Sequence, residues 1–217
     1  TALPTDAKHA AVEIVEYLDQ EVGGISRTAD LQPWVGHSPP SVPALRAFLQ
    51  GTDYAYQGLP GGGEHFRRAV ELAPDFVAAR VWLVSSLMGQ GEVDEAESNL
   101  QRLQSLRNDA SEFEQAMIGW AEAFVGGDRG AMVQHLQVAT RYAPRNNVLL
   151  FNLGASLATL GRLDEALQPV RTLVESEWEY PPLYPLWGWV ALANGEVEGL
   201  RQTLESALNF SPVYPFL

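Results

Sequence analysis

The sequence uses one phrase twice: residues 91–100 read GEVDEAESNL, and residues 161–170 read GRLDEALQPV. In both, a glycine is followed two positions later by a hydrophobic residue and then by Asp-Glu-Ala. Glycine commonly ends a helix because it adopts a left-handed backbone, and acidic residues stabilise the N-terminus of a helix. The phrase therefore predicts, at two places, a tight turn and the start of a second helix.

The glycine of this phrase recurs at a nearly constant period. Four glycines lie 36, 34 and 34 residues apart: Gly91, Gly127, Gly161 and Gly195. Three prolines that follow similar apolar phrases lie 70 and 68 residues apart: Pro74, Pro144 and Pro212. A two-residue insertion near residues 109–112 reconciles both series with a 34-residue unit. Such a period indicates an internal repeat.

Each unit reads as two helices joined at the glycine. The stretch LLFNLGASLATLG ends at Gly161, and DEALQPVRTLVE, with a second apolar period, follows it. Proline cannot continue a helix interior, so it stops the second helix. The pattern predicts five helix–turn–helix units, at residues 43–76, 77–110, 113–146, 147–180 and 181–214.

A 34-residue helix–turn–helix period is typical of tetratricopeptide repeats, and the chain resembles that family over about residues 43–214. Trp178 departs from the pattern, because it stands where a proline stop is expected. The unit with the most matching positions has them at Asn152, Leu153, Gly154, Leu157, Gly161 and Ala166. The resemblance implies an all-α fold, a right-handed α-α superhelix of about five units.

The first 42 residues do not match a repeat. Residues 7–22, AKHAAVEIVEYLDQEV, predict an amphipathic N-terminal helix, and a linker rich in proline and glycine follows up to Ser41. The chain begins with Thr and lacks a signal-peptide pattern. We therefore expect a fragment of a longer protein, in the cytoplasm rather than the periplasm.

The composition limits the possible partners. With 46 % hydrophobic and 19 % charged residues, the chain is typical of a folded protein. The absence of cysteine excludes disulfides and cysteine-type zinc sites. A formal net charge of -13 argues against a nucleic-acid partner, since affinity for phosphates comes largely from Lys and Arg. No apolar run is long enough to predict insertion into a membrane.

Motifs of catalysis and of cofactor or metal binding are absent. The four histidines have no metal-ligand spacing, and no nucleophile elbow, phosphate loop or dinucleotide motif occurs. We therefore predict no metal, no cofactor and no enzyme. A less favoured alternative is a repeat-scaffolded hydrolase, because Glu175, Glu177 and Glu179 lie among aromatic residues in ESEWEYPPLYPLWGW.

In the family that the chain resembles, the first helices of the repeats line a concave groove. Asn152 is the one residue that matches repeats gripping a chaperone's C-terminal carboxylate, because Phe151, Ala155 and Ala158 replace the basic clamp. The family's groove positions fall on residues that are mostly apolar: Phe48, Val81, Trp82, Met88, Met117, Phe124, Phe151, Asn152, Ala155 and Trp189. These residues predict a groove for an apolar peptide or partner segment.

Two alternatives to an open groove remain. The helix at residues 7–22 or the tail SPVYPFL fills the groove, or an exposed terminal repeat makes the chain a homo-oligomer. Phrases such as VPALRAFLQGTDYAYQG resemble arrays in the C-terminal parts of bacterial multidomain regulators. The resemblance implies a non-enzymatic interaction or scaffold module of a bacterial signalling protein.

Overall fold

The computed structural model describes residues 41–56, 59–176, 178, 180, 182–201 and 205. The predicted helix at residues 7–22, its linker and the tail SPVYPFL lie outside this part. The chain divides into two compact units, the first up to Leu149 and the second from Leu150, each considered by itself. The described residues form helices and no strands, as the repeat pattern predicts.

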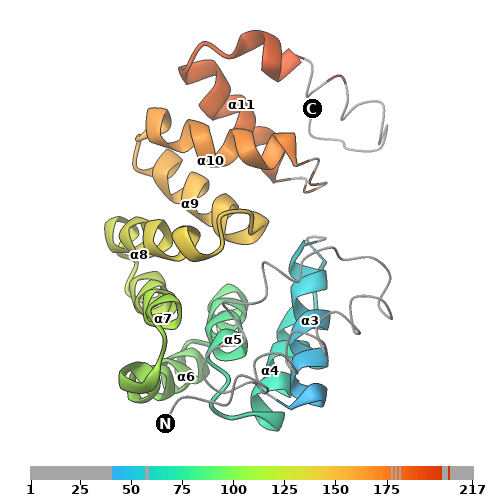
Figure 1. The fold of residues 1–217 in the computed structure, drawn as a ribbon, viewed down its shortest axis with the longest axis vertical. Coiled ribbons are helices and arrows are strands. Elements are labelled where there is room, and N and C mark those ends of the chain that lie inside the picture. Colours follow the sequence, from blue (N-terminus) through green and yellow to red (C-terminus); the bar gives the residue numbers. More distant parts are fainter. Residues whose placement is uncertain are drawn as a thin grey trace. The chain divides into compact units, whose positions relative to one another are not determined.

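The described residues of the first unit form three pairs of helices (Figure 1). The 3₁₀ helix η2 (Arg107–Asp109) precedes the third pair, where the sequence predicts a two-residue insertion. The pairs are α3 (Val42–Tyr56) with α4 (Gly62–Leu72), α5 (Val77–Gln90) with α6 (Val93–Leu106), and α7 (Glu112–Val125) with α8 (Arg129–Tyr142). Helix α5 also packs against α4 and α7, which joins the pairs into one body.

The second unit contains most of α9 (Asn147–Thr159), followed by α10 (Leu163–Glu175) and α11 (Leu183–Ala193). Residues 197–201 are again helical. Helices α10 and α11 pack together, and Gly154 of α9 faces Val170 of α10. None of the described helices is long and apolar enough to cross a membrane.

The four turn glycines adopt the left-handed backbone that the repeated phrase predicts. Their φ angles are 79°, 70°, 73° and 76° at Gly91, Gly127, Gly161 and Gly195. After each, the next residue donates its N–H to the carbonyl five positions earlier, over 2.8–3.0 Å. This hydrogen bond closes a Schellman-type helix end, so one turn is used four times. A fifth left-handed glycine, Gly61, begins α4.

The helix ends and the closest helix contacts also agree with the sequence. Helix α4 ends two residues before Pro74, and α8 two residues before Pro144. The alanines of the repeated Asp-Glu-Ala phrase, Ala96 and Ala166, are completely buried. Small side chains at these positions allow a close approach of neighbouring helices.

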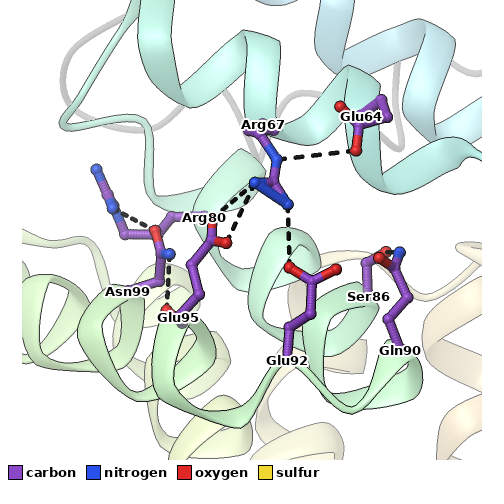
Figure 2. A network of polar contacts seen from close by, with 8 residues as sticks. All are labelled: Glu64, Arg67, Arg80, Ser86, Gln90, Glu92, Glu95 and Asn99. Carbon is purple, nitrogen blue, oxygen red and sulfur yellow. Dashed lines mark hydrogen bonds and ion pairs between the residues drawn. The ribbon is translucent and has the colours of Figure 1, made fainter.

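An arginine in the second helix of a repeat bridges to the next repeat at two equivalent places. Arg67 of α4 donates to Glu95 of α6 over 2.9 Å and lies 3.5 Å from Glu92 (Figure 2). Arg171 of α10 pairs in the same way with Glu196. The two arginines occupy the same repeat position, seven residues before Pro74 and Trp178.

Removal of the bridge at Arg67 is expected to have a small, salt-dependent effect. Its side chain is 31 % exposed and those of Glu92 and Glu95 are 45 % and 40 % exposed, so the pair is largely solvated. Arg67→Ala should reduce the free energy of unfolding by about 1 kcal/mol or less, measured by urea denaturation, and by less in 1 M salt. The control is Arg68→Ala, which removes a pair within α4 and should have a smaller effect. Equal losses would contradict a bridging role for Arg67.

Candidate interaction surface

Three of the residues predicted to line the groove belong to the core. Phe48, Val81 and Met117 are at most 1 % exposed. Phe48 packs against Phe66 and Phe76, with ring centroids 5.9 and 5.0 Å apart. Such side chains stabilise helix packing and do not face a partner. The candidates for contact with a partner are therefore the more accessible residues of the predicted set.

The other predicted residues are at least partly accessible. Six are half-buried: Trp82, Met88, Phe124, Phe151, Asn152 and Ala155. Trp189 is 50 % exposed, the largest accessibility in the predicted set. These seven residues lie on the first helices of their repeats, in two separate units.

In the first unit two of the accessible residues, Trp82 and Phe124, form an aromatic cluster with the buried Trp120. The rings of Trp82 on α5 and Trp120 on α7 are 5.7 Å apart, and Trp120 stacks on Phe124 at 5.2 Å and 21°. Trp120 is 1 % exposed, and its indole Nε1–H has no acceptor among the described residues. The projected groove positions do not include Trp120, which is buried and packs against both Trp82 and Phe124. The aromatic cluster gives this surface a rigid, apolar base.

In the second unit the accessible apolar residues form a stripe along α11. Pro185, Trp189, Leu192 and Ala193 are exposed, and their spacing of four, three and one places them on one helix face. Leu192 is 61 % exposed. The opposite face is buried and contains Leu183, Leu186, Trp187, Val190 and Ala191. We call the exposed residues the α11 stripe; of them, the projection found only Trp189.

Phe151 of α9 packs against two aromatic residues, Trp178 and Tyr180, in the segment between α10 and α11. Trp178 and Tyr180 stack at 4.5 Å and 15°, and the Phe151 ring meets Tyr180 edge-on at 4.9 Å. Burial raises the pKa of Tyr180, so its hydroxyl stays protonated at neutral pH. Glu175 is exposed at the end of α10. Glu177 and Glu179 lie outside the described residues, so the carboxylate arrangement of the hydrolase alternative is untested.

A buried arginine lies beneath the surface of the first unit. Arg80, on α5, is 8 % exposed, and its guanidinium donates to Asn99 Oδ1 and to the Pro74 carbonyl, each over 2.6 Å. Asn99 in turn donates to the Glu95 carbonyl (Figure 2). Burial, together with nearby Arg102, lowers the pKa of Arg80. This network is structural, and no group of three or more potential metal ligands occurs in the described part of the chain.

The imidazole of His135 packs on the α7 backbone. A Cβ at Gly119 would lie 2.3 Å from His135 Cε1, so only glycine leaves room for the ring. Arg107 of η2 and Glu122 of α7 form an ion pair, and both act on the imidazole. Burial and Arg107 lower the pKa of His135 from its ordinary value of 6.5, and Glu122 opposes them.

This environment predicts a loss of stability in mild acid. Because the pKa of His135 is lower in the folded state, the unfolded chain binds the proton first as the pH falls through 6.5. The free energy of unfolding should decrease from there down to the folded-state pKa. His135→Gln should reduce this decrease, measured by urea denaturation at several pH values between about 7.5 and 5. Parallel curves for the two proteins would show that His135 does not contribute.

Comparison with known proteins supports the repeat assignment. The family model described as tetratricopeptide repeat matches residues 48–113. A solved thermophilic TPR protein from Thermus thermophilus has 19 % identity and a TM-score of 0.52, covering 78 % of this chain and 92 % of its own. Solved pilF of Pseudomonas aeruginosa has 13 % identity and a TM-score of 0.53, covering 96 % and 94 %. No curated protein matches the sequence.

The described part of the chain therefore has an all-α helical-repeat fold. The family match confirms tetratricopeptide repeats over residues 48–113, in agreement with the 34-residue period.

Proposed function

We propose that this chain is a non-enzymatic interaction module that binds an apolar segment of a protein partner through the first helices of its repeats. The observation that carries the proposal is the exposed α11 stripe, in which Trp189 and Leu192 are 50 % and 61 % exposed. Contiguous exposed apolar side chains are typical of interaction sites, and tryptophan is enriched among the residues that dominate binding energy. The half-buried Trp82 and Phe124, which pack on the buried Trp120, offer a second contact surface.

We also propose that the module belongs to a larger bacterial regulatory protein. The support is the resemblance of its phrases to arrays in the C-terminal parts of such regulators. In that setting the repeats bind a partner, and catalysis lies in other domains. The alternative is self-association, for which the α11 stripe would also be suitable.

Substitution of Trp189 tests the binding proposal. Trp189→Glu should weaken capture of the partner by about tenfold or more, because it places a charge where an apolar anchor is needed. Partners captured from a lysate of the source organism are identified by mass spectrometry, and binding is then measured with the purified partner. Phe124→Glu tests the aromatic cluster in the same way.

A matched control is available on a second helix. Val93→Glu replaces an apolar residue of α6 that is 43 % exposed and should leave binding unchanged. Circular dichroism establishes that each variant retains its helix content. Equal capture by all four proteins would contradict binding through the first helices. Light scattering at two concentrations tests self-association, which Trp189→Glu should abolish if the α11 stripe is the dimer contact.

A further inference from the structure

The fifth position of the repeat changes from buried to exposed along the chain. The predicted units place five residues there: Ala47, Val81, Met117, Phe151 and Pro185. The three in the first unit are 6 %, 0 % and 0 % exposed, whereas Phe151 is half-buried and Pro185 is exposed. The fourth repeat, like the second and third, has a repeat before and after it in the sequence. A missing neighbour therefore does not explain the difference between Met117 and Phe151.

The described helices account for only part of this burial. Helix α5 packs against α4, α6 and α7. In an array of helix pairs such neighbours cover the flanks and the outer face of a first helix, and they leave its inner face as the concave surface. Val81 and Met117 reach 0 % exposure only if other atoms cover them from that inner side. The cover then comes from a part of the chain outside the described helices.

The chain before α3 belongs to the same unit as this inner face. The first compact unit extends from Thr1 to Leu149, whereas the tail SPVYPFL belongs to the second unit. Residues 23–41 join the predicted N-terminal helix to α3, and a chain of 19 residues spans up to about 60 Å when extended. The predicted helix is therefore within reach of α3, α5 and α7.

The N-terminal helix, predicted at residues 7–22, needs an apolar surface to pack on. Its apolar face consists of Ala11, Ile14, Val15 and Leu18. Isolated helices of this length are marginal in water, and in proteins their stability comes from burial of an apolar face. Sixteen helical residues extend about 24 Å, and packed helices lie about 8–10 Å apart, so this helix is long enough to cross α3, α5 and α7. The amphipathic helix and the buried inner face thus complement each other.

We propose that the N-terminal helix packs its apolar face on the inner face of α3, α5 and α7, and that this autoinhibitory contact closes the groove of the first unit. The α11 stripe is a different surface, so the contact holds whether or not that stripe binds a partner. The inference adds a condition to the second contact surface of the proposed function. A partner gains access to Val81 and Met117 only when the helix leaves.

Because the 217-residue chain contains no cysteine, one introduced thiol tests the inference directly on the whole chain. Val81→Cys places this thiol on the inner face, where its reaction with N-ethylmaleimide should be slow because a buried thiol is inert. Addition of Ile14→Glu puts a charge on the apolar face of the N-terminal helix and should accelerate the reaction by about tenfold or more. Gln20→Glu adds the same charge on the polar face and should leave the rate unchanged. Fast reaction of Val81→Cys alone would overturn the inference.

Two controls separate release of the helix from unfolding. Ala139→Cys, at a completely buried position of α8, should stay unreactive in the presence of Ile14→Glu, and circular dichroism measures the helix content. If Ile14→Glu unfolds the unit, the milder Val15→Ser takes its place. A synthetic peptide of residues 5–24 should slow the reaction of the Val81→Cys, Ile14→Glu protein, whereas the same peptide carrying Ile14→Glu should not. Failure of the natural peptide to protect the thiol would contradict the proposed contact.

Other covers of the inner face give different results, and each would overturn the inference. Acceleration by Trp34→Glu but not by Ile14→Glu would identify the linker as the cover. Acceleration by Phe216→Glu alone would identify the tail. A reaction rate that depends on protein concentration would identify a second copy of the chain. A slow reaction in every variant would show that the described helices bury Val81 by themselves.

Discussion

Gly154→Leu is expected to reduce the free energy of unfolding of the second unit by about 3 kcal/mol. A Cβ at Gly154 would lie 2.5 Å from Val170 Cγ2, well inside van der Waals contact. Valine is branched at Cβ and has little rotamer freedom, so Val170 cannot move aside without a shift of α10. Chemical denaturation followed by tryptophan fluorescence and circular dichroism measures the loss.

The same substitution in an open position is the matched control. Gly89 lies in the last turn of α5, and a Cβ there would meet no atom within 4 Å. Gly89→Leu should stabilise the protein by up to about 1 kcal/mol, because leucine favours a helix more than glycine does. Val170→Ala should partly restore Gly154→Leu by removing the clashing methyl groups. Equal effects at the two glycines would contradict close packing of α9 on α10.

Local features of the chain were predictable because their causes are local. The left-handed turns at Gly91, Gly127, Gly161 and Gly195 require glycine, so the sequence pattern reveals them directly. The prolines that end α4 and α8 act through their own ring geometry. Helix bounds follow from such signals, and the 34-residue period places each turn relative to the next.

The accessible surface was harder to predict because accessibility depends on what covers a residue. Phe48 occupies a position projected to the groove, yet Phe66 and Phe76 pack over it. Leu192 lies on the same helix face as Trp189 and is more exposed, although only Trp189 was projected. A helical wheel of α11 would have shown this stripe, because its exposed residues recur with helical spacing. No such spacing in the sequence indicates that Trp120 is buried beneath Trp82 and Phe124.

Arg80 shows a further limit, because its two hydrogen-bond acceptors come from two other segments of the chain. No charge pattern in residues 77–90 indicates that this arginine is buried, since its acceptors are Asn99 on α6 and the carbonyl of Pro74 between α4 and α5. A long cation takes part in the core only because these neutral oxygens replace its water. Sequence periodicity identifies the face of a helix but not such a network.

Asn99→Leu is expected to reduce the free energy of unfolding by about 3 kcal/mol, because it removes an acceptor and leaves the buried Arg80 guanidinium poorly compensated. Asn99 is 9 % exposed, so water does not readily replace its oxygen. Urea denaturation measures the loss.

Arg80→Met provides the comparison, because it removes the cation as well as its hydrogen bonds. Methionine retains much of the apolar stem of the side chain, so Arg80→Met should cost less than Asn99→Leu. In the double variant neither the charge nor its acceptor remains, and stability should recover toward that of Arg80→Met alone. The two substitutions should therefore be non-additive by about 1.5 kcal/mol or more. Additive losses would show that the hydrogen bond between Arg80 and Asn99 contributes nothing specific, and that the guanidinium finds other acceptors when Asn99 is removed.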